Sequence, residues 1–395
     1  MNTRPSKQNP DSSDPRAYAR RILLAVTGLS PQVVTETLYA LAVKRSPKWV
    51  PTKIRLITTA TGAREARLNL LTPKTGWFHR MRADYGLPAI AFANNDVVAL
   101  DRADGTPLDD IRTPEENQLA ANLIIETVRD LTADPDTALH VSIAGGRKTM
   151  GYYLGYALSL YGRPQDRLSH VLVSEPYETN RDFFYPTPSE HIIRVRRNGK
   201  EYTFDAKEAD VQLAEIPFVR MRDGLPDRLR SGQSSFGAAV AAANRGHAEP
   251  RLVVDLPSRE VRVDDELLKL GPTEFTFLFW LARRAREDRA AVDWSQWAAA
   301  EEFLDAAKQV LNPNGGDYER IENALEWRRN SAIKLAKYFE PHKSRVNTAL
   351  QKALGQTAAL RYSIVRSGTK SAGPLFYLQL TRQQIDIRRG KPPHD

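Results

Sequence analysis

The segment LHVSIAGGRKT, at residues 139–149, decides the fold. It connects a run of strand-forming apolar residues, through Gly145 and Gly146, directly to the start of a helix. A second segment of the same kind, ILLAVTGLSP, occupies residues 22–31. Strands that alternate with helices form parallel α/β sheets, and ligands bind there at the carboxyl ends of the strands. We therefore expect both loops to lie at one edge of one sheet.

Both loops offer groups that attract anions. A helix start presents free backbone N–H groups and a partial positive charge. Ser30 adds a hydroxyl group, and Arg147 and Lys148 add two cations. The pattern therefore predicts a phosphate-binding site. The candidate ligand-binding residues are Thr27, Gly28, Leu29, Gln32, Gly145, Gly146, Arg147 and Thr149.

Two common phosphate-binding motifs do not fit these loops. A P-loop needs a lysine directly after its last glycine, but Arg147 stands between Gly146 and Lys148. A dinucleotide-binding turn needs three spaced glycines, and the first loop has only Gly28. The ligand is therefore not expected to be held in the manner of ATP or NAD.

Ser30 and Lys148 each allow a second interpretation. Ser30 could cap the helix that follows it, and no Gly-x-Ser-x-Gly motif or paired histidine indicates a serine hydrolase. Lys148 stands at a helix start, where a cation is unfavourable unless an anion compensates it or the side chain extends into solvent. The seven histidines lack the spacing of a zinc site, Glu36 is interpreted as an ordinary helix residue, and no metal or cofactor is expected.

The first part of the chain predicts a mainly parallel sheet with helices on both faces. A pair of short strands at 192–196 and 201–204 is expected to extend that sheet in antiparallel fashion. Tyr152, Tyr153, Tyr156 and Tyr161 fall on one predicted helix and are interpreted mainly as core or dimer face, or as a base-stacking group. Other expected strands are 21–26, 54–58, 138–143 and 169–173, and expected helices are 31–43, 63–71, 114–131 and 148–161.

Length and composition suggest two domains in a soluble, cytoplasmic protein. The chain has 395 residues and no cysteine, and no stretch reaches the roughly 18–20 apolar residues of a membrane span. We expect a disordered tail at 1–19, a first domain at 20–221, a linker at 222–250 and a second domain at 251–395.

Positive charge is concentrated at the end of the chain. Residues 328–395 hold 14 Lys and Arg against 3 Asp and Glu, whereas residues 251–327 hold 10 against 16. Such a localised cationic surface favours a nucleic-acid partner, although a solvated basic face would have the same composition.

The second domain predicts a winged helix-turn-helix. Helices at 272–285, 294–311, 317–339 and 341–354 precede strands at 362–365 and 375–380, which flank a basic loop at 366–374. The candidate DNA-binding residues are Lys343, Arg345, Lys352, Arg366 and Lys370.

Residues 20–222 resemble the CRISPR-associated ring nucleases of type III systems, whereas the second domain lies outside this resemblance. The segments that carry it are TGLSPQVVTETL (27–38), SIAGGRKTM (142–150), QDRLSHVLVS (165–174) and AEIPFVR (214–220). The resemblance implies a Rossmann-like CARF (CRISPR-associated Rossmann-fold) domain and a homodimer.

The resemblance also implies a function. Members of this family bind cyclic tetra-adenylate at the dimer axis and cut it, which switches off the defence signal. The family's serine maps onto Ser30 and its lysine onto Lys148, which are the expected catalytic residues. The substrate's own 2′-hydroxyl would attack, giving linear di-adenylate with a 2′,3′-cyclic phosphate. A regulator that senses cyclic oligoadenylate and binds double-stranded DNA remains the alternative.

Overall fold

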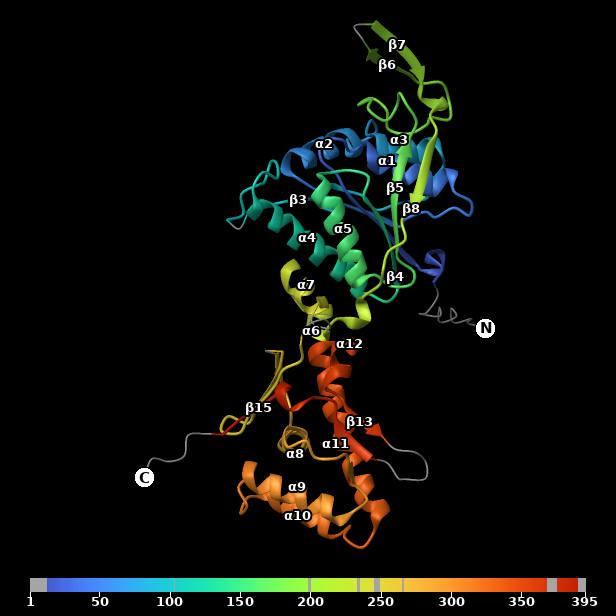
Figure 1. Cartoon of the computed structure of the whole chain (residues 1–395). Helices are drawn as coiled ribbons and strands as arrows, with labels where there is room; N and C mark the ends of the chain where they lie inside the picture. Colours follow the sequence, from blue (N-terminus) through green and yellow to red (C-terminus); the bar gives the residue numbers. More distant parts are fainter. Residues whose placement is uncertain are drawn as a thin grey trace, which may run out of the picture. The chain divides into compact units, whose positions relative to one another are not determined.

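The chain divides into two compact units (Figure 1). One comprises Met1–Arg222 and Gln233–Ala238, and the other Asp223–Gly232 and Ala239–Asp395. The computed structural model describes residues 13–102, 104–197, 200–232, 235–244, 249–264, 266–367 and 375–389. Most of the tail expected at 1–19 therefore lies outside the described residues, as does Lys370.

The first unit is built on a six-stranded sheet in the order β3-β2-β1-β4-β5-β8. The first five of these strands pair in parallel, and only β8 is antiparallel. The predicted α/β fold with a mainly parallel sheet is thereby confirmed. The strands are β1 (Arg20–Val26), β2 (Lys53–Thr58), β3 (Val97–Ala99), β4 (Thr137–Ser142), β5 (Arg167–Val173) and β8 (Val211–Glu215).

Strand β1 lies in the middle of this sheet because its residues are apolar and buried. Leu23, Leu24 and Val26 are fully buried, and Leu24 pairs with Arg55 on one side and Val141 on the other. Helices α1 (Gln32–Tyr39), α2 (Ala60–Leu71) and α3 (Trp77–Asp84) contribute to one core cluster with the sheet. Helices α4 (Pro114–Ala133) and α5 (Lys148–Tyr161) pack against each other and against β4.

One expectation for the first unit was wrong. The hairpin of β6 (Ile192–Arg197) and β7 (Lys200–Asp205) forms its own two-stranded sheet and does not extend the large one. Ile193 and Phe204 of the hairpin pack in a core cluster with Val171 and Val211, whereas the first four residues of β7 are exposed. Strand β8 takes the edge position instead. The helix expected over 31–43 is present, as α1 to Tyr39 and then as a wider π turn over Ala40–Lys44.

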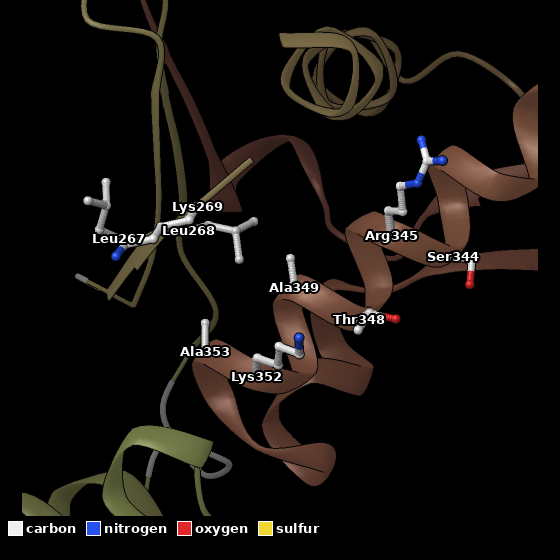
Figure 2. Close-up of a pocket in the computed structure, with 9 residues that line it drawn as sticks. All are labelled: Leu267, Leu268, Lys269, Ser344, Arg345, Thr348, Ala349, Lys352 and Ala353. Carbon is white, nitrogen blue, oxygen red and sulfur yellow. The ribbon is translucent and has the colours of Figure 1, made fainter. Parts of the chain in front are cut away.

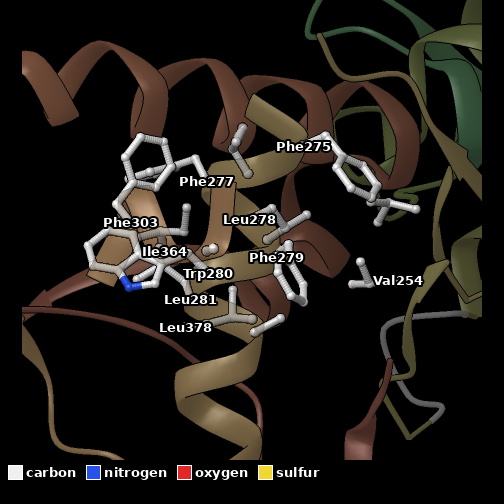
Figure 3. Packing of buried hydrophobic residues seen from close by; sticks show 14 of the residues in the cluster. Val254, Phe275, Phe277, Leu278, Phe279, Trp280, Leu281, Phe303, Ile364 and Leu378 are labelled. Carbon is white, nitrogen blue, oxygen red and sulfur yellow. The ribbon is translucent and has the colours of Figure 1, made fainter. Parts of the chain in front are cut away.

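The second unit combines a helical core with two small sheets. The sheets have the orders β11-β10-β9-β15 and β12-β14-β13. Aromatic residues fill the core between the helices, including Phe277, Trp280 and Phe303 (Figure 3). The elements are β9 (Leu252–Asp255), β10 (Glu260–Val263), β11 (Glu266–Leu268), α8 (Pro272–Arg286), β12 (Val292–Asp293), α9 (Trp297–Val310), α10 (Gly316–Glu326), α11 (Ala332–Leu354), α12 (Gln356–Ala359), β13 (Ile364–Ser367), β14 (Leu375–Leu378) and β15 (Ile385–Arg388).

The helices of the second unit end at different residues than expected. One helix was predicted over 317–339 and another over 341–354, but α10 ends at Glu326 and α11 runs from Ala332 to Leu354. The hydroxyl of Ser331 accepts a bond from the Lys334 N–H and caps the new helix. Pro341 remains inside α11, because Phe339 and Val346 on either side of it are buried in the core.

The segment expected as a linker, 222–250, contains two short helices, α6 (Asp227–Ser231) and α7 (Phe236–Asn244). Strands β13 and β14 pair as the expected antiparallel hairpin, and residues 368–374 between them lie outside the described residues. None of the helices within the described ranges is both long and apolar enough to cross a membrane.

Candidate functional site

The two glycine loops meet at the carboxyl ends of β1 and β4. A Cβ atom placed on Gly28 would lie 3.7 Å from the Cα atom of Gly146. A Cβ atom on Gly145 would lie 2.7 Å from the carbonyl oxygen of Val26, which is too close for any side chain. Gly146 has a φ angle of +80°, in the left-handed region that favours glycine. The glycines are therefore needed for the two backbones to approach each other.

Thr27 brings an unsatisfied hydroxyl group into the first loop. Its N–H donates to the carbonyl oxygen of Ile57, and its carbonyl oxygen accepts from the Thr58 hydroxyl at 2.7 Å. Its own Oγ1 atom is buried and finds no partner among the residues that the structure describes. Thr27 is fully buried, so this hydroxyl group is not exposed to a ligand in the surrounding solvent.

Ser30 does not act as the cap of α1. The N-cap position belongs to Pro31, and no side chain bonds to the first turn of the helix there. Ser30 is exposed, and its hydroxyl group makes no hydrogen bond within the described ranges. The free hydroxyl group and the uncapped N–H groups are therefore both available to an anion.

Lys148 and Arg147 differ in what they contact. The guanidinium of Arg147 binds Asp110 through two hydrogen bonds, one of them 3.0 Å from Nε to Oδ1. This bond lowers the pKa of Asp110 below its usual value. Lys148 is the exposed first residue of α5 and has no ion pair in the described part of the chain. Of the two predicted cations, only Lys148 lacks a carboxylate partner in the described residues. Thr149 beside it is exposed as well.

Gln32 and Glu36 are two of the four polar residues buried on α1. Gln32 donates from Nε2 to the carbonyl oxygen of Arg181 at 2.8 Å, whereas its Oε1 atom lacks a partner in the described residues. Glu36 lies one turn further along and is only 6% exposed. Burial, with a smaller contribution from the charge of Glu178, raises the pKa of Glu36 to about 8. Burial therefore favours the neutral form of Glu36, in contrast to an exposed carboxylate on a helix. Little in the sequence indicates this, because three of the six residues in the run VVTETL are polar.

In the part of the chain that the structure describes, the surroundings of the loops differ from a metal or histidine site. Within the described residues, no group of three His, Cys, Asp or Glu side chains is arranged to hold a metal ion. His140 on β4 is buried and bonds to the Ser169 hydroxyl at 2.7 Å. Burial lowers the pKa of His140 to about 3, so the ring is neutral and structural.

The candidate DNA-binding residues of the second unit lie in different surroundings. Arg345 and Lys352 line one groove of about 560 Å³ between α11 and β11, together with Lys269 (Figure 2). Arg345 also pairs with Glu274 at 2.9 Å. Lys343 lies apart from this groove, pairs with Glu340 at 3.0 Å and contacts the ring of Phe376. Arg366 is exposed on β13. Sequence reasoning did not single out Lys269, because only folding brings β11 beside α11.

Comparison with known proteins gives one family match. The model of the family described as CRISPR-associated protein NE0113 matches residues 30–248. Among solved structures, Enterococcus italicus Csm6 bound to cyclic hexa-2′-fluoro-hexa-dAMP matches at 12% identity with a TM-score of 0.25. That match covers 85% of this chain and 60% of the Csm6 chain, so the present chain spans less than two thirds of that protein. No curated protein gives a significant match.

Proposed function

Because the chain belongs to the family of CRISPR-associated protein NE0113, we propose that its first unit binds and cleaves cyclic tetra-adenylate. The protein is thus a CRISPR-associated one, and the proposal assigns it the task of removing a cyclic oligoadenylate signal. The expected products are linear di-adenylates that end in a 2′,3′-cyclic phosphate.

The meeting of the two loops carries this proposal. It brings together an uncompensated cation, Lys148, and the uncapped starts of α1 and α5 at one edge of the sheet. Ser30 is exposed on the first loop, and its hydroxyl group has no partner in the described residues. Helix starts and cations bind phosphate, and hydroxyl groups donate to its oxygens. A cyclic oligonucleotide offers phosphates without a free terminus.

The reaction follows from these groups without a protein nucleophile. The 2′-oxygen of a ribose attacks the neighbouring phosphorus, the bond from phosphorus to the 5′-oxygen breaks, and the 5′-oxygen leaves as a hydroxyl group. The proton lost by the 2′-hydroxyl passes to solvent, and solvent returns one to the 5′-oxygen. Lys148 stabilises the negative charge that grows on the phosphorane. Ser30 and the loop N–H groups hold the three reacting atoms in line.

A homodimer suits a substrate of this shape. A ring of four identical nucleotides has two-fold symmetry, and two copies of the chain would present two identical pairs of loops to it. Each pair would then cut one of two opposite phosphodiester bonds. The size of the proposed substrate, a ring of four nucleotides, comes from the resemblance to ring nucleases.

The test compares matched lysine variants in single-turnover cleavage of cyclic tetra-adenylate. Lys148→Ala should lower the rate by about 100-fold or more, the usual effect of removing one group that stabilises an oxyanion. Lys207→Ala removes an exposed lysine elsewhere in the first unit and should leave the rate within about twofold of wild type. Equal rates for wild type and Lys148→Ala would contradict the residue assignment.

The second unit favours DNA binding as an additional function. Its sheet order β12-β14-β13, with α8 and α11 packed against it, supports the proposal of a winged helix. The groove offers Lys269 and Lys352 as cations for phosphate contacts, whereas Arg345 in the same groove is paired with Glu274. A mobility-shift assay with double-stranded DNA, with and without cyclic tetra-adenylate, tests this function. A shift that depends on the ring would support a sensor, and no shift in either condition would contradict DNA binding.

A further inference from the structure

We propose that Tyr152 is a base-stacking residue of the same site and holds one adenine of the bound ring. This inference rests on the proposed function, because it takes a cyclic oligoadenylate as the ligand. It adds a binding contact that lies outside both glycine loops.

The position of Tyr152 on α5 connects it to the phosphate site. Residues four apart on a helix lie on the same face, one turn above each other. Lys148 is the first residue of α5, so Tyr152 follows it by one turn and Tyr156 by two. A turn of helix rises about 5.4 Å, which is within the reach of a nucleotide whose phosphate contacts Lys148 and whose base lies over Tyr152.

The ring of Tyr152 is exposed but held in place. Its side chain is 63% exposed, the highest value among the tyrosines that are exposed in the described residues. Its ring centroid lies 5.9 Å from that of Tyr153 and 5.9 Å from that of Tyr156. Those two rings pack against Phe236 at 5.0 Å and 5.4 Å. Such a fixed aromatic surface loses little conformational entropy when a base stacks on it.

The surroundings favour a nucleotide over a second copy of the chain as the occupant. Lys148 on the same helix face carries a charge without a partner in the described residues, and burying it against a protein surface would be costly. A nucleotide supplies both a phosphate for the lysine and a flat ring for the tyrosine. Leu29, which is 59% exposed on the first loop, adds a further apolar group at this edge of the sheet.

The experiment uses cyclic tetra-adenylate in which one adenine is replaced by fluorescent 2-aminopurine. Fluorescence at saturating protein reports stacking, and the titration midpoint reports Kd. Tyr152→Ala should weaken binding by about fivefold or more, as removal of a stacking aromatic does, and should restore most of the quenched fluorescence. Tyr152→Phe keeps the ring and should match wild type. Tyr202→Ala, at an exposed tyrosine on β7, is the matched control and should also match wild type.

Several results would overturn the inference. These are unchanged quenching in Tyr152→Ala, no binding of the ring by wild type, and a change from dimer to monomer in sedimentation velocity for Tyr152→Ala alone. The last result would make Tyr152 an interface residue. If wild type binds and quenches the probe in a manner that depends on Tyr152 but leaves it uncut, the inference stands and the proposed cleavage fails.

Discussion

Gly145 shows most directly how single residues set the geometry of the site. A methyl group there would lie 2.7 Å from the Val26 carbonyl oxygen and 2.9 Å from a Val33 methyl group. The second loop would have to move away from the first, and the groups of both loops would separate. The local spacing of the site therefore depends on the absence of one side chain.

Gly145→Ala is accordingly expected to destabilise the protein by about 1–3 kcal/mol, the usual cost of overpacking, and to abolish binding of the ring. Urea denaturation measures the first effect and calorimetry with cyclic tetra-adenylate the second. Gly237→Ala is the matched control, because a Cβ atom on Gly237 of α7 meets no atom within 4 Å. The control substitution should leave the stability unchanged or raise it slightly. If Gly145→Ala bound cyclic tetra-adenylate as tightly as wild type, the proposed role of Gly145 would be contradicted.

Glu36 should make the stability of the first unit depend on pH. Its pKa is raised from 4.5 to about 8 by burial, so the folded protein binds a proton that the unfolded chain releases. Between about pH 4.5 and pH 8, the free energy of unfolding should then fall by on the order of 4 kcal/mol because of this group. Above that range it should level off.

Glu36→Gln keeps the shape of the side chain and removes the titration. Its free energy of unfolding should change less than that of wild type between pH 5 and pH 9, and it should exceed that of wild type at pH 9. Urea titrations across this range measure both. Parallel pH profiles for the two proteins would show that Glu36 is not responsible.

At the scale of elements, local sequence accounts for the strands and loops better than for the ends of helices. The two loops were predictable because each combines an apolar strand, glycine and a helix start within about ten residues. The position of the β6–β7 hairpin was not, because its strands mix apolar and charged residues and their pairing partner depends on tertiary packing. The ion pair of Asp110 with Arg147 joins residues 37 apart and is likewise set by the fold.

Helix α11 offers a test of how packing overrides local preference. Pro341 lacks the N–H that would bond to the preceding turn, so it destabilises a helix interior. Pro341→Ala should stabilise the second unit by about 1 kcal/mol or more and raise its Tm, without affecting cleavage. Pro272→Ala is the control, because Pro272 stands at the start of α8, where a proline is tolerated. It should bring no gain, and an equal gain in both variants would contradict this view of Pro341.

At the scale of the whole molecule, the net charge suggests more free Lys and Arg side chains than the fold leaves available to a partner. The last 68 residues carry a large excess of Lys and Arg, but Lys343 and Arg345 are both paired with glutamates. The groove between α11 and β11 adds Lys269, which lies outside the basic segment. The sequence therefore indicates the kind of partner, and folding selects the residues that are available to it.

For DNA binding, Lys352→Ala should weaken the affinity about equally for different sequences and reduce the slope of log K against log salt by about 1. Lys343→Ala should have a smaller effect, because its charge is already compensated by Glu340. Filter binding at several salt concentrations measures both slopes. An equal loss of slope in the two variants would contradict the assignment of the groove.

We propose that the site where the two loops meet cuts a cyclic oligoadenylate without help from a metal ion. The decisive experiment incubates the full chain with cyclic tetra-adenylate in EDTA and identifies the products by mass spectrometry. We expect linear di-adenylate with a 5′-hydroxyl and a 2′,3′-cyclic phosphate. An intact ring after prolonged incubation would contradict it.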